Sequence, residues 1–380
     1  MLSKIEKLVA CVCVSIMAVL VFVNVIARYV FGNSLAVSDE MSTYLFVLMS
    51  FMGTAVAARR KAHLGLSIVT DHVSPRARLI ISMVMYAISA LFCLLIVIFG
   101  IQMVISQYQM GQETATQMRM KVIDMIYKAQ SGHPGGSLSA ADFVTACYFK
   151  YMNIDPKDPR WPDRDRMVLS KGHVCPIQYA CLASVGFFPE SELDTLRKEG
   201  SMLQGHPSMN RCPGIDISTG SLGQGLACAV GMAMAGKMDH KDYKVFCVVG
   251  DGEAQEGEIW EAANTAHKYG LDNLIVFVDY NNLQLDGTCD EIMPNGDLGE
   301  KFKAFGWETL ELDGHSMEEI VACIDKCYAS KNGKPKCLYA HTVKGKGVSF
   351  MENQCGWHGV APNDEQYAQA MAELKAQLID

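Results

Sequence analysis

Two oxygen-bearing side chains follow neighbouring apolar runs, at positions that suit a metal–diphosphate site. The run 244–249 leads into a Gly-Asp-Gly loop at 250–252, and the next apolar run, 273–280, ends at Asn281. Glycine lets the backbone approach phosphates, the N-terminus of a following helix supplies free N–H groups, and Asp251 offers the hard oxygen that Mg²⁺ prefers. An isolated Gly-Asp-Gly can be a simple tight turn. The pairing with an Asn after the next strand favours the magnesium–diphosphate interpretation.

Alternating strands and helices must position these residues. From residue 117 onward, short apolar runs alternate with amphipathic stretches. The strands are expected at 244–249, 273–280, 307–312 and 336–342, and the helices at 253–269 and 317–328. This rhythm predicts an α/β domain with a mainly parallel sheet and with its functional loops at the carboxyl ends of the strands.

Several histidine- and glycine-rich motifs lie in the same region. They are Ser-Gly-His-Pro-Gly-Gly-Ser at 131–137, Ser-Lys-Gly-His at 170–173, Gly-His-Pro at 205–207, Thr-Gly-Ser-Leu-Gly-Gln-Gly at 219–225 and Gly-Trp-His-Gly at 356–359. With the loop at 250–252 and the Asn pair at 281–282, they resemble the transketolase family in order and spacing. The resemblance covers 118–380 and corresponds to the N-terminal, thiamine-diphosphate-binding half of that family. Ser221 stands where many relatives have proline.

The resemblance implies roles for individual residues. His133, His206 and His358 would line the channel for the sugar, and Asp251, Asn281 and the carbonyl of Leu283 would bind Mg²⁺, with Ca²⁺ or Mn²⁺ as substitutes. The residues expected to serve the cofactor are His173, Gly220, Leu222, Gly252, Glu256, Asn281 and His358. Among them, Glu256 would belong to a carboxylate network that links the two sites of a dimer. The histidines at 240, 267, 315 and 341 are interpreted as hydrogen-bonded structural residues.

The activity implied is transfer of a two-carbon ketol unit between sugar phosphates, with thiamine diphosphate as the electron sink. A related ketol-transfer enzyme such as deoxyxylulose-phosphate synthase is the alternative, although the Gly-His-Pro-Gly motif at 132–135 favours transketolase. The resemblance ends at Asp380, before the family's second domain, which holds the pyrimidine ring and supplies the activating glutamate. We therefore expect a component of a homo- or hetero-oligomer that is inactive without a separate C-terminal subunit.

The first part of the chain has a different composition. Three stretches without charge, at 8–27, 41–58 and 79–105, are each long enough to span a bilayer. The basic residues between the second and third stretches place that loop and the N-terminus in the cytoplasm by the positive-inside rule. An inner or plasma membrane location is expected for this segment, and cytoplasm is where the enzyme region belongs.

A second resemblance concerns this membrane segment. The run Arg-Tyr-Val-Phe-Gly-Asn-Ser-Leu at 28–35, then Asp39-Glu40, Gly53 and the basic stretch 59–63 resemble the small membrane subunit of TRAP transporters, the DctQ type. That family takes part in organic acid import and has four membrane helices, whereas three are predicted here. The resemblance gives domains at 1–116 and 117–380, the first an all-α membrane segment. No site residues are transferred from it.

The two regions differ in charge and in the compartment they require. Residues 1–117 carry eight Lys/Arg and five Asp/Glu, and the remainder carries 25 and 36. The acidic region has no basic stripe with interleaved aromatics, which argues against nucleic-acid binding. With the N-terminus inside, three spans would deliver the enzyme region, with eleven cysteines, to an oxidising space. The hypotheses are a split-enzyme subunit, a transporter subunit, and a chimeric reading frame that joins the two.

Overall fold

The computed structural model describes residues 12–24, 45 and 73–378 and divides the chain into two compact units, Met1–Gly100 and Ile101–Asp380. In the first unit, residues Val12–Asn24 are helical within the first predicted span. The second predicted span, 41–58, lies outside the described residues apart from Leu45. This limit between residues 100 and 101 follows from the density of contacts within each unit, and the domain limit between 116 and 117 stays a prediction.

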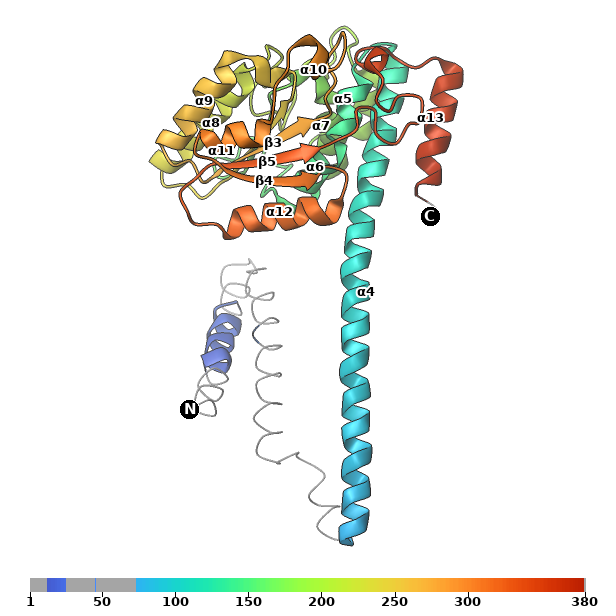
Figure 1. Ribbon diagram of the computed structural model, residues 1–380, viewed down its shortest axis with the longest axis vertical. Helices are drawn as coiled ribbons and strands as arrows, with labels where there is room; N and C mark the ends of the chain where they lie inside the picture. Colours follow the sequence, from blue (N-terminus) through green and yellow to red (C-terminus); the bar gives the residue numbers. More distant parts are fainter. Residues whose placement is uncertain (1–11, 25–44, 46–72, 379–380) are drawn as a thin grey trace. The chain divides into compact units, whose positions relative to one another are not determined.

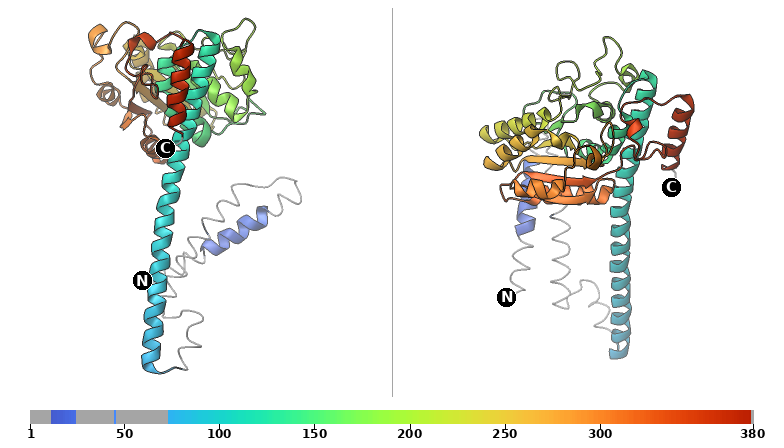
Figure 2. Two further views of the ribbon diagram at one scale, coloured as in Figure 1. Left: turned by 90° about the vertical axis from the view of Figure 1, so that its right-hand side faces the viewer. Right: turned by 45° about the horizontal axis from the view of Figure 1, so that its top comes forward.

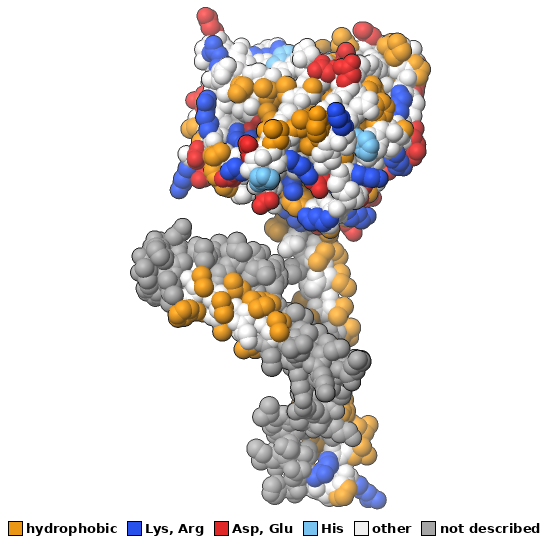
Figure 3. All heavy atoms as spheres, turned by 90° about the vertical axis from the view of Figure 1, so that its left-hand side faces the viewer, with side chains coloured by type: hydrophobic (Ala, Val, Ile, Leu, Met, Phe, Trp, Pro, Cys, Tyr) orange, Lys and Arg blue, Asp and Glu red, His pale blue; other side chains and the backbone are white. Residues whose placement is uncertain are grey.

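Helix α4 (Pro75–Ala129) contains the third predicted span. Among the described residues it is the one helix long and apolar enough to cross a membrane, and none of its most apolar window is buried. Leu91 and Phe99 are more than half exposed, and hydrophobic side chains are visible along this stretch in Figure 3. A core helix would bury such residues, so a lipid environment accounts for them better.

The second unit is built on one parallel sheet. Its strands are β1 (Arg166–Leu169), β2 (Val245–Gly250), β3 (Leu274–Tyr280), β4 (Glu308–Asp313) and β5 (Lys336–His341), in the spatial order β1-β2-β3-β5-β4. Every neighbouring pair is parallel. The predicted α/β fold is confirmed. The four predicted strands are present, and the short β1 is an addition that the sequence pattern did not indicate.

Helices cover both faces of the sheet because alternate strand residues point to opposite sides. The helices of this unit, beside the end of α4, are α5 (Pro134–Ser139), α6 (Ala141–Ala146), α7 (Cys175–Val185), α8 (Gln224–Met238), α9 (Gly257–Lys268), α10 (Cys289–Ile292), α11 (Leu298–Ala304), α12 (Met317–Ala329) and α13 (Asp364–Ala376). Phe246 and Phe277 share one core with α4, α6, α7 and α12, while Cys247 and Val276 share the other with α8, α9 and α11. Figure 1 shows α12 on the side of the strands opposite α8 and α9.

The last turns of α4 belong to this α/β core. Ala115, Met118, Val122 and Ile126 are buried in the first core. Helix α13 lies beside the same turns in Figure 2, and Tyr367 stacks on Tyr127 with ring centroids 4.0 Å apart. The chain thus passes from exposed apolar residues to core residues within one helix, without a Gly- or Pro-rich linker.

Candidate active site

A cavity of about 260 Å³ lies at the carboxyl edge of the sheet. The register pairs Gly250 with Asp279 and Tyr280 with His341, so the loops after β2, β3 and β5 begin at the same edge. The cavity is lined by Gly136, Lys171, His173, Leu222, Gly250, Asp251, Gly252, Glu253, Asn281, Leu283, Gln284, Leu285, Lys344 and His358. Residues that are far apart in the sequence therefore meet here, as the parallel sheet predicts.

Asp251 is the central acid of the cavity and is only 3% exposed. Its Oδ1 accepts from the N–H of Gly252 at 2.7 Å, and its Oδ2 accepts from the N–H groups of Asn281 at 2.9 Å and Asn282 at 2.5 Å. Burial and the charge of Asp279 raise the pKa of Asp251 to about 6. A cation beside this carboxylate would favour its ionised form.

The loop after β2 differs from the expected start of a long helix. Residues Glu253–Gln255 form a single 3₁₀ turn, and α9 begins only at Gly257. The free N–H groups of Gly250 and Gly223 are taken up by the buried carboxylate of Glu253, at 3.0 and 2.9 Å. Glu253 is thus a structural residue of the loop, and the pattern-based prediction did not single it out.

Two lysines that the sequence prediction did not select reach the cavity. Lys171 forms a buried ion pair with Asp279, and this pair outweighs the effect of burial and lowers the pKa of Asp279. Lys344, 2% exposed, donates from Nζ to the carbonyls of Leu283 at 3.3 Å and Gln284 at 3.0 Å. Two ammonium groups in one small cavity favour an anionic ligand. Lys171 stands two residues before His173, and Lys344 follows the end of β5. These positions were the signals by which the sequence could have indicated both lysines.

The predicted histidines form one cluster at the cavity. The ring of His133 lies 5.2 Å from that of His173, 5.5 Å from that of His358 and 6.4 Å from that of His206, measured between centroids. Burial and the charge of Arg197 lower the pKa of His133 to about 4, and burial and Lys344 do the same for His358. Burial also lowers the pKa values of His173 and His206. The cluster is therefore neutral at pH 7.

Neighbouring cations select the tautomers of two of these rings. Lys344 Nζ lies 2.9 Å from His358 Nδ1, and Arg197 Nη2 lies 3.3 Å from His133 Nδ1. An ammonium or guanidinium can only donate, so both Nδ1 atoms accept and both neutral rings carry their proton on Nε2. Two Nε2–H donors are suited to holding the hydroxyl or carbonyl oxygens of a sugar.

Three other predicted residues lie around the cavity in different ways. Gly220 packs against His206, where an added Cβ would come within 2.7 Å of the imidazole, and Leu222 lines the cavity while 40% exposed. Glu256 is exposed and lies beside Gly223, where an added Cβ would come within 3.1 Å of the Cβ of Glu256, and it does not line the cavity. The predicted residues that line the cavity are His173, Leu222, Asp251, Gly252, Asn281, Leu283 and His358. His133, His206 and Gly220 lie beside it in the histidine cluster, and Glu256 lies apart, just before α9.

The donor set fits a metal-bound diphosphate. Gln284 lines the cavity, and its side-chain nitrogen is buried without a hydrogen-bond partner. Within the described residues, no group of three or more His, Cys, Asp or Glu side chains is arranged for a metal. A metal here would depend on one carboxylate with amide, carbonyl and phosphate oxygens, which is the mixture that Mg²⁺ accepts.

Sequence comparisons identify both regions. The family described as transketolase, thiamine diphosphate binding domain, matches residues 110–377. The family described as tripartite ATP-independent periplasmic transporters, DctQ component, matches residues 17–127. The two matches overlap on the last turns of α4. Both resemblances stated from the sequence are confirmed.

Similar proteins cover the second region. A 6-deoxy-6-sulfo-D-fructose transketolase subunit of Clostridium sp. is 47% identical over 70% of this chain and 96% of the relative. One of the subunits of an apulose-4-phosphate transketolase from Phocaeicola vulgatus is 44% identical over 68% of this chain and 92% of the relative. Transketolase from Campylobacter jejuni has a similar structure, with a TM-score of 0.66 and 34% identity, over 71% of this chain but only 45% of that one. Through residues 110–377 the chain belongs to the transketolase family, as a transketolase-type transferase subunit with the thiamine-diphosphate-binding domain, preceded by a DctQ-type segment.

Proposed function

We propose that this chain is the cofactor-binding subunit of a split transketolase and that it transfers a two-carbon ketol unit only together with a C-terminal subunit. The observation that carries the proposal is the cavity at the sheet edge, with Asp251, Lys171 and Lys344 in its wall. Support also comes from length. The chain spans nearly all of the subunit-type relatives but less than half of the Campylobacter jejuni transketolase chain.

The cavity is proposed to hold thiamine diphosphate through Mg²⁺. Asp251, the amide oxygen of Asn281 and the carbonyl of Leu283 are the proposed metal ligands. The proposed cofactor contacts are His173, Gly220, Leu222, Gly252, Asn281 and His358. When bound, the cofactor would supply the carbon that carries the ketol unit and the electron sink for the reaction. Ca²⁺ or Mn²⁺ could replace Mg²⁺ because the donors are oxygens.

The histidines are proposed to handle the sugar. His133 and His358 have pKa values of about 4, and their neutral rings present Nε2–H groups that would hold sugar oxygens. His206 lies on the exposed side of the cluster, where it would meet the sugar as it enters. Because Nδ1 of each ring already accepts from a cation, only Nε2–H is left to act, and it can donate to a sugar oxygen at pH 7 without a buried charge on the ring.

The partner is proposed to complete the site. Leu222 and Leu285 line the cavity and are 40% and 61% exposed, so one wall is open. Glu256, exposed beside Gly223, is proposed to face another subunit rather than the cofactor. The donor and acceptor are proposed to be sugar phosphates or similar anionic sugars. The relatives are named for apulose-4-phosphate and 6-deoxy-6-sulfo-D-fructose.

Residues 1–116 are proposed to attach the chain to a membrane, with 117–380 as the enzyme domain. A cytoplasmic enzyme domain requires an even number of spans after the cytoplasmic N-terminus, so one of the three predicted stretches would then not cross the bilayer. Met110 is 56% exposed whereas Ala115 is fully buried, which supports a boundary near 116. A transporter role for the DctQ-type segment, and a chimeric reading frame, are the competing explanations of the join. An unbroken genomic reading frame across the codons for 112–120 would overturn the chimera. Co-purification with a large TRAP permease subunit would support the transporter role.

The test of the enzyme proposal is reconstitution. The full chain in detergent is mixed with a separately produced C-terminal transketolase subunit in the presence of thiamine diphosphate and Mg²⁺. A ketose phosphate and an aldose phosphate serve as donor and acceptor. Ketol transfer is expected only when both chains are present, and it should be lost in Asp251→Ala. Transfer by the full chain alone, or equal transfer by the Asp251→Ala variant, would contradict the proposal.

A further inference from the structure

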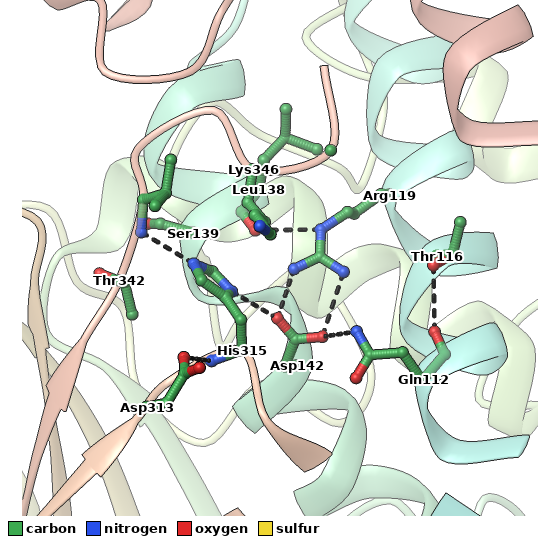
Figure 4. Close-up of polar contacts among 12 residues, drawn as sticks. Gln112, Thr116, Arg119, Leu138, Ser139, Asp142, Asp313, His315, Thr342 and Lys346 are labelled. Carbon is green, nitrogen blue, oxygen red and sulfur yellow. Dashed lines mark hydrogen bonds and ion pairs between the residues drawn. The ribbon is translucent and has the colours of Figure 1, made fainter. Parts of the chain in front are cut away.

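His315 occupies a buried position between a carboxylate and the loop that carries Lys344. The N–H of Val343 donates to Nε2 of His315 at 2.8 Å, and Nδ1 lies 2.8 Å from Oδ2 of Asp142 (Figure 4). A backbone N–H can only donate, so Nε2 must be an unprotonated acceptor. The neutral ring therefore carries its proton on Nδ1 and donates it to Asp142. Both ring nitrogens have fixed partners.

Asp142 is held in one orientation by two residues of α4. Arg119 pairs with both of its oxygens, and Gln112 Nε2 donates to Oδ1 at 3.1 Å (Figure 4). Asp142 is fully buried, and Arg119 is 2% exposed. Burial would raise the pKa of Asp142, but Arg119 and His315 outweigh it and hold it at about 2. The carboxylate stays ionised and has no free direction in which to turn, so the imidazole plane is fixed as well.

The loop after β5 is thereby held at two consecutive residues. Thr342 donates its hydroxyl to the buried Asp279, and Val343 donates its N–H to His315. Lys344 comes next, and its ammonium is 2.9 Å from His358 Nδ1 inside the cavity. The side chain of His315 does not line the cavity. Its effect on the site must pass through the backbone at Val343.

We propose that His315 is a positioning residue, which holds the N–H of Val343 so that the charge of Lys344 lies where the diphosphate of the cofactor would bind. The three N–H groups of Lys344 donate to Leu283, Gln284 and His358, so Lys344 attracts the diphosphate through its charge. It contacts neither cofactor nor sugar. This inference rests on the proposed function, because Lys344 matters in this way only if the cavity binds a diphosphate. It turns a histidine that the sequence indicated as merely structural into a determinant of cofactor affinity.

Two substitutions separate the two hydrogen bonds of the ring. His315→Asn keeps an N–H donor where Nδ1 lies but has no atom at the place of Nε2, so the Val343 N–H loses its acceptor. His315→Gln is longer and can place its amide oxygen near the position of Nε2. An unpaired buried N–H costs enough to weaken binding by about 10-fold or more if the loop shifts to relieve it. The Gln variant should stay within about 3-fold of the wild type, because the acceptor is restored.

The experiment is calorimetric titration of thiamine diphosphate, at saturating Mg²⁺, into the full chain in detergent. Inorganic pyrophosphate is titrated as a second probe of the diphosphate part alone. The same substitutions are made in a Lys344→Met background. If His315 acts through Lys344, then His315→Asn has no further effect there. The unfolding midpoint of each variant, followed by tryptophan fluorescence, reports any general loss of structure.

The outcomes are distinguishable. If the wild type binds and His315→Asn binds equally well, or if its loss persists unchanged in the Lys344→Met background, the inference is overturned. If His315→Asn does not fold, the folded His315→Gln variant provides the test. A loss of cofactor affinity above 10-fold in that variant also overturns the inference. A folded wild-type chain that does not bind thiamine diphosphate at all would instead overturn the proposed function on which the inference rests.

Discussion

The buried pair of Arg119 and Asp142 should show strong energetic coupling. The two side chains are 2% and 0% exposed, and they are joined by two hydrogen bonds. Removing one partner leaves the other charge buried without compensation, which typically costs about 3–5 kcal/mol. Removing both charges avoids that cost. We therefore predict that Arg119→Met and Asp142→Asn are each destabilising by about 3–5 kcal/mol, whereas the double variant lies within about 2 kcal/mol of the wild type.

Tryptophan fluorescence isolates the relevant unit in the full chain. All four tryptophans, at 161, 260, 307 and 357, lie in the second unit. Urea unfolding in mild detergent at pH 7.5 therefore reports the α/β unit, and the four proteins of the cycle are compared by midpoint and slope. Equal slopes are required before the free energies are subtracted.

The coupling energy decides the outcome. We predict that the sum of the two single losses of stability exceeds the loss of the double variant by about 3 kcal/mol or more. If the double variant is destabilised by the sum of the singles, the two charges do not compensate each other, and the buried pair is not what fixes Asp142. Far-ultraviolet circular dichroism of each variant serves as the control for gross misfolding.

Three further predictions address pH, packing and the membrane. The pKa of Asp142 is held at about 2, below its ordinary value of 3.8. Its ionised form therefore contributes about 2 kcal/mol to the free energy of unfolding above pH 4, and this contribution is lost as the pH falls through 2. Urea unfolding between pH 5 and pH 2.5 should show a steeper loss of stability for the wild type than for the double variant of Arg119 and Asp142. Gly172→Ala would place a Cβ 2.7 Å from the backbone nitrogen of Gly220, so it should lower the free energy of unfolding by about 1–3 kcal/mol. Urea unfolding measures this loss. The control is Gly231→Ala, whose added Cβ meets nothing within 4 Å and which should not be destabilised. Leu91→Arg lies in the exposed apolar stretch of α4 and should disfavour membrane insertion by about 2.5–3.5 kcal/mol. After a carbonate wash of the membranes, this variant should move from the pellet to the supernatant, whereas the control Leu91→Met should stay in the pellet. Equal distributions of the two variants would argue against a membrane span here.

The positions of the residues at the strand ends were predictable because neighbouring parallel strands end at the same edge of a sheet. An apolar run followed by Gly-Asp-Gly, and another followed by Asn281, meet at one edge whenever both runs are parallel strands of the same sheet. The sequence therefore indicated that Asp251 and Asn281 would lie close together. In the structure, Asp251 accepts a hydrogen bond from the N–H of Asn281 at 2.9 Å.

The supporting contacts were not predictable in the same way. Lys171 and Asp279 are 108 residues apart, and His315 and Asp142 are 173 apart, so no local spacing connects them. Strand β1 has only four residues and gives little periodicity to detect. Helix α4 runs through the join of the two regions because 106–120 has no Gly-Pro or Pro signal to end it.

The most direct test of the account is Mg²⁺-dependent binding of thiamine diphosphate to the full chain, measured by calorimetry without a partner subunit. The wild type is expected to bind the cofactor when Mg²⁺ is present and to lose binding with excess chelator. Inorganic pyrophosphate should compete, and Asp251→Ala should lose the Mg²⁺-dependent binding while its unfolding midpoint shows that it is folded. A folded wild-type chain without Mg²⁺-dependent binding, or an Asp251→Ala variant that binds as well as the wild type, would contradict the assignment of this cavity.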